Sequence, residues 1–513
     1  MISTIVIIVM RSKPLPADVL QEIFDYFSDD MFTLHSCILV NRLWSEVATP
    51  LFWRKTSNLL SIPKKYIMGS IFRNWISCLS EESKNILSDN GIILTSPIKR
   101  PPMFDYLGFC RSLSYWDITK IVDDMYDLEV EDLVSINSGG LDNSRCLYNK
   151  YLIKQELFKT IVNRCSSIEF LDISEFVHLD IPLPHLSGAE IWFSNLRELH
   201  CDVSTSSGFY YRLAQICRNL EIINCFYSSR DNNGFAILIE VQNNLQQLGF
   251  RISHGIFSKA CPNIERALLS HADTLTHLSL KGESMSIPLT VISAFNKLHT
   301  LELHFTDNIN QEILERLESK SFPTLRVLKM GGILAPLEMI LRLIRRTGGN
   351  LKIISLYGFV LPKEEVARIF NNEIIPRYCN KLEYVTVWCT EKHFKDIERI
   401  LTSCHQLKGI SMRTLPTDKK KLNGDPLFQL LSREAPKSLT KLRIRGKWDI
   451  TPQALDTFLS IRKIEGKKLF SIHICLDEGD IEITSKHNEV IKKYQKCGIL
   501  KYEVEGKFTG EFN

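Results

Sequence analysis

The sequence lacks the motifs that mark most kinds of active site. In its 513 residues there is no G-x-S-x-G turn, no phosphate-binding P-loop, no H-E-x-x-H helix and no dinucleotide-binding glycine fingerprint. Its fourteen cysteines include no pair at the C-x-x-C spacing that begins most structural zinc sites. We therefore expect a protein that is not an enzyme, with no catalytic residue, no metal and no cofactor.

Signals for secretion or membrane insertion are also scarce. There is no N-x-[ST] acceptor, and Met1–Met10, though apolar, is too short to span a bilayer and has no basic residue before it. Three interpretations of this segment stay open. It is a secretory signal, or a disordered tail, or the result of a start codon placed nine residues too early, with Met10 as the true start. Whether Met1–Val9 belongs to the mature protein is therefore open. We expect reduced thiols and a cytoplasmic and/or nuclear location.

Charge of one sign is not in excess. The net charge is only +4, with 44% hydrophobic and 24% charged residues, a composition typical of folded chains. We therefore expect neither nucleic acid nor a membrane as a partner. The length exceeds that of one ordinary core, which indicates either several domains or a repeat array.

Residues 12–58 have the pattern of a small helical module. Apolar residues at Val19, Leu20, Ile23, Phe24 and Phe27 fall on one helical face, after a proline suited to a first turn. A second helical pattern begins near Leu34, and Pro50 is expected to mark its end. So few residues bury little surface alone, so the module needs a neighbour or a partner to cover it.

The order of its residues resembles the F-box. The matching blocks are Leu-Pro-x-Asp-Val-Leu-x-x-Ile-Phe from Leu15, Val-Asn-Arg-Leu-Trp from Val40, and Pro-Leu-Phe-Trp from Pro50. Two mild departures are Asn41, where the family often has Cys, and Asp18, where it often has Glu. The resemblance implies a three-helix fold that docks on the Skp-type adaptor of SCF ubiquitin ligases, and through it on a cullin scaffold. The resemblance also implies which residues contact that adaptor or support the contacting surface. They are Leu15, Pro16, Val19, Leu20, Ile23, Phe27, Val40 and Trp44.

Residues 59–160 show helical fragments and turns but no repeat, and we expect a mixed helical and loop connecting region. A helix is expected over Asp117–Met125, and Val134–Asn149, which contains two adjacent glycines, is expected to be a loop.

From residue 161 to residue 513 one pattern of apolar residues recurs. In each copy three apolar residues occupy the first, fourth and sixth positions, as in LHTLEL from Leu298. Twelve copies start 23 to 32 residues apart. Their first positions are Ile168, Leu196, Leu220, Leu245, Leu275, Leu298, Leu325, Leu351, Leu382, Leu407, Leu439 and Leu469. Alternation at period two predicts strands, and amphipathic stretches such as Leu337–Arg346 and Glu364–Tyr378 predict helices between them.

This pattern resembles the leucine-rich repeat. The resemblance implies an α/β fold: a curved solenoid of about twelve repeats, with parallel strands on the concave face and helices on the convex face, after an N-terminal three-helix F-box and an apolar tail at residues 1–11. Four cysteines precede a first repeat position by three residues, namely Cys165, Cys217, Cys379 and Cys404. They resemble the cysteine-containing repeat subtype, in which the thiol is a small buried hydrophobe.

In such an array the residues between core positions face outward along the strands, and those of the last third combine aromatic and basic side chains. The candidate substrate-binding residues are Tyr357, Tyr384, Trp388, Arg413, Arg443 and Arg445. Aromatic residues and arginine are common anchors of protein interfaces, and clustered arginines suit acidic or phosphorylated segments. A solvated face with incidental charges is the alternative. His299, Glu302 and His304 share one strand, where an exposed polar face explains them better than a metal site does.

Two functions follow from these patterns. The chain is expected to be the substrate-recognition subunit of an SCF-type ubiquitin ligase, with the F-box on the adaptor and the repeats on a protein whose identity the sequence does not reveal. The alternative is a repeat scaffold for protein interactions that acts outside a ligase.

Overall fold

The computed structural model describes most of the chain. The described residues are 15–55, 65–94, 102–128, 134–135, 143–174, 181–227, 231–252, 261–282, 289–305, 315, 319–332, 337–356, 364–390, 394–415, 421–464, 469–475 and 483–505. The apolar segment 1–11 and Tyr357 lie outside them. The chain divides into an N-terminal unit, residues 1–226 and 232–245, and a C-terminal unit, residues 227–231 and 246–513.

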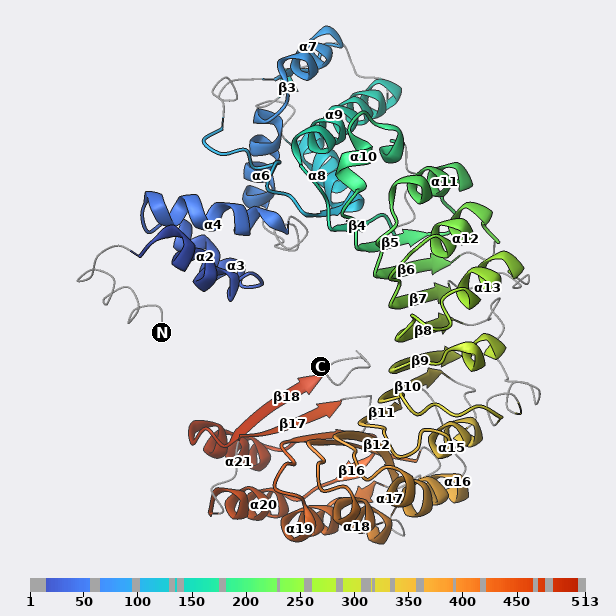
Figure 1. Cartoon of the computed structure of the whole chain (residues 1–513). Helices are drawn as coiled ribbons and strands as arrows, with labels where there is room; N and C mark the ends of the chain where they lie inside the picture. The colour runs from blue at the N-terminus through green and yellow to red at the C-terminus, as the bar shows by residue number, and fades with distance from the viewer. Residues whose placement is uncertain are drawn as a thin grey trace. The chain divides into compact units, whose positions relative to one another are not determined.

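The N-terminal unit begins with three helices and continues into a parallel sheet (Figure 1). Its strands pair in the order β2-β4-β5-β6, and each pairing is parallel where the register is defined. The helices are α2 (Ala17–Asp25), α3 (Met31–Ile38), α4 (Arg42–Arg54), α6 (Lys65–Ser77), α7 (Glu81–Asp89), α8 (Tyr115–Leu128), α9 (Asn143–Arg164), α10 (Ala189–Phe193), α11 (Ser207–Ile216) and α12 (Asn233–Glu240), with a 3-10 turn at Leu183–His185. The strands are β2 (Ser112–Ser114), β4 (Phe170–Asp172), β5 (Glu198–Asp202) and β6 (Ile222–Tyr227), and a separate pair joins β1 (Ile93–Leu94) to β3 (Val134–Ser135).

The C-terminal unit repeats a strand followed by a helix, and its main strands pair in parallel in the order β7-β8-β9-β10-β11-β12-β13-β15-β17-β18. The strands are β7 (Gln247–Ile252), β8 (His277–Gly282), β9 (Thr300–Phe305), β10 (Val327–Gly332), β11 (Ile353–Leu356), β12 (Tyr384–Cys389), β13 (Gly409–Thr414), β15 (Lys441–Arg445), β17 (Phe470–Cys475) and β18 (Leu500–Glu505), with a short pair β14 (Leu422–Asn423) and β16 (Trp448–Asp449). The helical segments are α13 (Pro262–Leu269), η2 (Leu289–Ala294), α15 (Leu337–Arg345), α16 (Glu364–Ile369), η3 (Phe370–Ile374), α17 (Ile375–Tyr378), α18 (Phe394–Ser403), α19 (Asp425–Glu434), α20 (Pro452–Ile464) and α21 (Ser485–Lys496). Among the described helices, none combines the length and the apolar character needed to cross a bilayer.

The parallel strands bear out the predicted α/β repeat fold, which resembles a leucine-rich-repeat array. Each of the twelve predicted copies contains one of the strands β4 to β13, β15 or β17. Equivalent apolar residues lie in register, such as Leu301 with Leu328 and Leu328 with Ile354, and all three are fully buried. Each unit also has one strand beyond the predicted copies: in the N-terminal unit β2 pairs with β4, and in the C-terminal unit β18 pairs with β17.

At several repeats, the residue three positions before the first apolar position forms a hydrogen bond as well as apolar contacts. The thiols of Cys165 and Cys404 donate to the carbonyl oxygens of Cys110 and Cys379, at 2.8 and 3.3 Å, in the preceding repeat. Gln242 takes the same position in its own repeat, where its amide donates to the Cys217 carbonyl at 3.0 Å. Burial raises the pKa of Cys217 and of Cys404 to about 12, so these thiols stay protonated and unreactive at neutral pH.

Three local predictions were wrong. The helix expected to end at Pro50 continues to Arg54, because Leu51 and Trp53 are buried and their packing offsets the hydrogen bond that proline cannot make. The loop expected over Val134–Asn149 is helical from Asn143 onward. Leu469 is 49% exposed, and Phe470 is the buried residue that begins the last predicted copy. The ring of Phe470 packs against the buried guanidinium of Arg462, 4.2 Å from its centre.

We expect Asn232, which links two consecutive repeats, to be essential to the N-terminal unit. Its amide donates to the carbonyls of Val203 and Thr205, and its oxygen accepts from the Phe235 N–H at the start of α12. Asn232→Ala should lower stability by about 2–4 kcal/mol, since a helix cap is lost and two carbonyls are left unsatisfied. Asn243→Ala, at an exposed position, is the control. Hydrogen exchange of the α12 amides measures both, and equal protection in the two variants would contradict this role.

Candidate interaction surfaces

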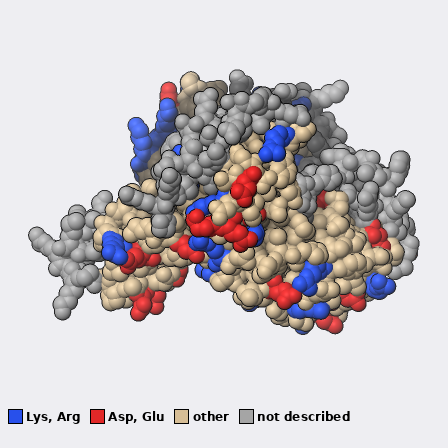
Figure 2. Space-filling model, turned by 90° about the horizontal axis from the view of Figure 1, so that it is seen from above, with Lys and Arg blue, Asp and Glu red and all other residues tan. Residues whose placement is uncertain are grey.

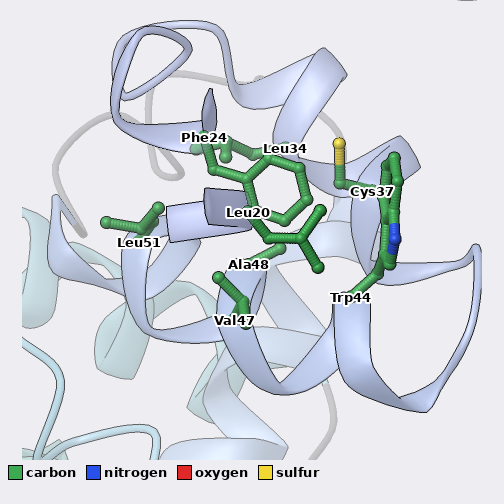
Figure 3. Packing of buried hydrophobic residues seen from close by; sticks show 8 residues of the cluster. All are labelled: Leu20, Phe24, Leu34, Cys37, Trp44, Val47, Ala48 and Leu51. Atoms are coloured by element: carbon green, nitrogen blue, oxygen red, sulfur yellow. The ribbon is translucent and has the colours of Figure 1, made fainter. Parts of the chain in front are cut away.

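The helical module α2–α4 has a core of its own. Two helix starts are fixed by side chains: Asp30 accepts from the Thr33 N–H, and Asn41 from the Trp44 N–H, both at 3.0 Å. Phe24 and Trp44 meet edge to face with ring centres 5.1 Å apart. Figure 3 shows Leu20 and Phe24 pointing toward Leu34, Val47 and Ala48 between the helices. The module is therefore packed rather than a loose set of short helices.

The residues that the F-box resemblance assigned to the adaptor fall into three groups by burial. Leu20 and Trp44 are core residues, 1% and 8% exposed, so in this structure they brace the surface rather than contact a partner. The half-buried residues that pack against that core are Leu15, Ile23 and Phe27. The exposed residues are Pro16, Val19 and Val40.

Three more apolar residues on the module are exposed, and the sequence motif did not point to them. They are Tyr26, Phe32 and Leu39, which are 90%, 79% and 72% exposed. Each lies within or directly after a helix that also buries apolar residues: α2 buries Leu20 and Phe24, and α3 buries Leu34 and Cys37. The signal available in the sequence was that these residues lie off the apolar face of their helices. We call Val19, Tyr26, Phe32, Leu39 and Val40 the module surface.

The end of α4 is joined to the edge of the N-terminal sheet. The Arg111 N–H donates to the Arg54 carbonyl at 2.9 Å, and Lys55 forms a parallel bridge with Ser112 of β2. One guanidinium nitrogen of Arg54 also lies 2.9 and 3.0 Å from the two carboxylate oxygens of Glu169. These contacts surround a polar cavity of about 500 Å³ in which basic and acidic side chains occur in equal number. Its balanced charges favour a structural joint over a binding site.

On the C-terminal unit we define the strand face as the sheet face opposite the helices. Of the predicted substrate-binding residues, Tyr384, Arg413, Arg443 and Arg445 are half-buried. Arg413 is in register with Arg445, and Ser411 with Arg443, so these side chains lie on neighbouring strands. Arg413 also reaches across β12, where its guanidinium donates to the Leu356 carbonyl at 3.1 Å. These four residues are therefore brought together over β12, β13 and β15.

Trp388 does not belong to this surface, although the alternation of the strand predicted that it would. It is 1% exposed, its ring packs edge-on against Phe370 at 5.5 Å, and its carbonyl accepts from the buried Asn371 amide at 2.7 Å. The η3 segment that follows α16 packs over the end of β12. The alternation of residues within the strand does not predict which other segment packs on it. Trp388 is a core residue.

Trp388→Ala should therefore destabilise the C-terminal unit by about 3–5 kcal/mol, the usual cost of removing a buried tryptophan. Leu469→Ala, which removes a side chain that is half exposed, should cost much less. Thermal unfolding and hydrogen exchange of β12 amides compare the two. If Trp388→Ala left stability intact, the ring would not be a core element.

Lys281 of β8 and Glu302 of β9 form a partly buried ion pair. Glu302 accepts from Lys281 and from Ser279, both at 3.0 Å, and its side chain is only 12% exposed. Burial opposes its ionisation, but the hydrogen bonds and the charges of Lys281 and Lys329 outweigh that effect and lower its pKa. Burial also lowers the pKa of His304, which keeps that ring neutral near pH 7. No group of three or more potential metal-binding side chains occurs among the described residues.

The lowered pKa of Glu302 predicts a pH effect. A carboxyl whose pKa falls on folding stabilises the fold above its unfolded pKa, here near 4.5, and loses that contribution as pH falls through the folded pKa. Between about pH 6 and pH 3, Glu302→Gln should therefore lose less stability than the wild type does. Thermal midpoints across this range measure the difference, with the exposed Glu373→Gln as control. Parallel curves for wild type and Glu302→Gln would contradict the assignment.

Figure 2 shows basic and acidic side chains in mixed groups on the face that it draws, with no large coloured area of one sign. This agrees with the small net charge of the chain. Interaction surfaces must therefore be sought in local groups of side chains rather than in one field that covers the molecule.

No model of a known protein family matches the chain, and no curated protein matches it either. The solved structures that are similar to it include the following two. The Rad7 and Elc1 complex in yeast contains a chain with 14% identity and a TM-score of 0.38, covering 56% of this chain and 78% of that one. The mouse RP105/MD-1 complex contains one with 12% identity and a TM-score of 0.30, covering 67% and 80%.

Proposed function

We propose that this chain is the substrate-recognition subunit of an SCF-type ubiquitin ligase. The helical module α2–α4 docks on a Skp-type adaptor, the adaptor links it to a cullin scaffold, and the parallel repeats bind a target protein. The observation that carries the proposal is the module surface: a small packed module keeps five large apolar side chains in water, and its sequence has the three F-box blocks in order.

The exposure of these side chains favours a partner. Single exposed apolar residues are ordinary, but the module surface gathers Val19, Tyr26, Phe32, Leu39 and Val40 within fewer than 25 consecutive residues. Large aromatic and aliphatic side chains of this kind dominate the energetics of protein interfaces once they are desolvated. The core beneath them is already closed by Leu20, Phe24 and Trp44, so they are not needed inside the module.

The proposed role is non-catalytic, because ubiquitin transfer belongs to other subunits of such a ligase. The cysteines support this in the part of the chain that is described: most are buried, and burial raises the pKa of Cys165, Cys217 and Cys404, which disfavours the thiolate that a nucleophile requires. The same thiols are unbridged, which supports a cytoplasmic or nuclear location.

A repeat scaffold that works outside a ligase is the second candidate. The joint between α4 and β2 favours it to a degree, because Lys55 pairs with the edge strand and Arg54 with Glu169, as a helical cap on a solenoid would. A cap of that kind has no need of exposed apolar side chains, so the two functions differ in what the module surface does.

Co-purification separates the two. The full chain should capture a Skp-type adaptor, and Val19→Asp/Val40→Asp should reduce capture by at least about tenfold, since two charges would be buried in an apolar interface. Leu15→Ala/Pro16→Ala should act in the same direction.

The matched control is Tyr211→Asp, which places one charge on a side chain that is 42% exposed on α11 and lies outside the module. It should leave capture intact. Thermal midpoints of all variants check that the module still folds. Unchanged capture by both double variants would rule out the ligase role and leave the scaffold.

A further inference from the structure

We propose that the edge strand β18 pairs with β18 of a second copy of this chain, in an antiparallel arrangement centred on Tyr502. The pairing joins two C-terminal units through one continuous sheet, and it places Lys501 of each copy opposite Glu503 of the other. It does not depend on the proposed ligase role, because it uses residues of the C-terminal unit alone.

In the part of the chain that the structure describes, β18 is paired on one side only. It pairs with β17, and no described strand pairs with its other side (Figure 1). The edge strand of the N-terminal unit differs, because Lys55 forms a bridge to Ser112 of β2. An open edge presents main-chain N–H and C=O groups that a further strand can satisfy. The free side of β18 is therefore a place where a strand can be added to the C-terminal unit.

The hydrogen bonds to β17 determine which residues of β18 face the free side. The Phe470 N–H donates to the Ile499 carbonyl at 2.8 Å, and Phe470 is in register with Leu500. Because alternate residues of a strand bond to the same neighbour, the odd-numbered residues of β18 turn their main-chain groups toward β17. The main-chain groups of the even-numbered residues, Leu500, Tyr502 and Val504, therefore point to the free side.

The strand β18 lacks several features that make an edge unsuitable for pairing. Its sequence, LKYEVE from Leu500, contains neither proline nor glycine, and its register with β17 is continuous and has no bulge. It does carry charges, which usually protect an edge. A row of charges of one sign would repel a second copy, whereas Lys501 and Glu503 place both signs on one face of the strand.

Symmetry and charge together select one register. Two copies that use the same edge of the same strand run antiparallel around a two-fold axis. With the axis at Tyr502, every residue that points to the free side meets one that does so in the other copy, and Lys501 lies opposite Glu503. A shift of the axis by one residue would place Lys501 opposite Lys501, or Glu503 opposite Glu503. Like charges at opposite positions destabilise a sheet, so both neighbouring registers are disfavoured.

The side chains of Lys501 and Glu503 are accessible to a second copy. They are 58% and 40% exposed, and Nζ of Lys501 lies 2.6 Å from one oxygen of Glu503 in the same chain. The other oxygen of Glu503 lies 3.1 Å from Nδ1 of His473. The hydrogen bond from Lys501 lowers the pKa of Glu503, so this carboxylate is ionised at neutral pH. In the paired strands each lysine would lie between two carboxylates, which gives a ring of alternating charge.

The contact is small, so we expect a reversible dimer. A pair of strands of this length buries less area than the interfaces of obligate dimers, and a dissociation constant of about 1–100 μM is expected. The two-fold axis is perpendicular to the sheet, so the strand faces of both copies lie on the same side. Such a dimer allows bivalent binding of a partner that itself has two copies of its site.

Sedimentation velocity of the purified full chain, over about 1–100 μM, tests the proposal. The wild type should shift from monomer to dimer across this range. Lys501→Glu places a carboxylate opposite Glu503, and Glu503→Lys places an ammonium opposite Lys501, so each variant alone should dimerise at least about tenfold more weakly. Mixed in equal amounts, the two variants should dimerise with each other, because the opposite positions again carry opposite charges.

The control is Lys437→Glu, which makes the same change of charge at an exposed position outside β18 and should leave dimerisation intact. Thermal midpoints check that the variants fold, and recovery in the mixture shows that each still has an edge able to pair. A wild type that stays monomeric across the range would overturn the proposal. So would a dimer that Lys501→Glu leaves unchanged, since that dimer would use another surface.

Disulfide trapping tests the register. Opposite residues of a non-hydrogen-bonded antiparallel pair, here 501 and 503, have Cα atoms about 4.5 Å apart, within the range that a disulfide spans. All variants carry Cys497→Ser, which removes an exposed thiol. With oxidised glutathione as oxidant, Lys501→Cys mixed with Glu503→Cys should give cross-linked dimers, and neither variant should do so alone. Cross-linking of Lys501→Cys with itself, or none in the mixture, would overturn the Tyr502-centred pairing.

Discussion

The fold depends on the pairing of each strand with its parallel neighbours. One strand and one helix cannot bury the apolar side of a repeat, so Leu328 needs Leu301 on one side and Ile354 on the other. The same pairing aligns every outward side chain with its counterpart on the next strand, about 4.8 Å away. The chemistry of the strand face is therefore set by rows of neighbouring residues, such as Arg413 and Arg445.

Pairing of this kind leaves β2 as an edge strand in the N-terminal unit and β18 as one in the C-terminal unit. An open edge attracts other strands unless it is covered or charged. At the first edge, Lys55 bridges to Ser112 of β2, and Arg54 is tied to Glu169 of the next strand region. At the last edge, β18 carries Lys501 and Glu503, which contact each other. The helical module is therefore attached to the N-terminal sheet through its backbone. The exposed large apolar side chains of the module are those of the module surface.

Much of the fold was predictable from sequence, because period-two alternation in twelve copies leaves little choice of structure. Strand β2 was missed because its apolar run is short, at Ser112–Ser114, and only pairing with β4 identifies it. Strand β18 was also missed, although Ile499, Tyr502 and Val504 have the spacing of a further copy. Within one copy, the sequence does not show which of the adjacent residues Leu469 and Phe470 is buried. Both are apolar and adjacent, and the choice of Phe470 for the core follows from its contact with Arg462, a residue on the preceding helix.

The candidate site was less predictable, because alternation gives the direction of a side chain but not what covers it. Trp388 was expected outward and is covered by Phe370, whereas Gly409, which has no side chain to count, is what allows the Tyr384 ring to lie across β13. With Trp388 in the core, the aromatic contribution to the strand face falls to Tyr384.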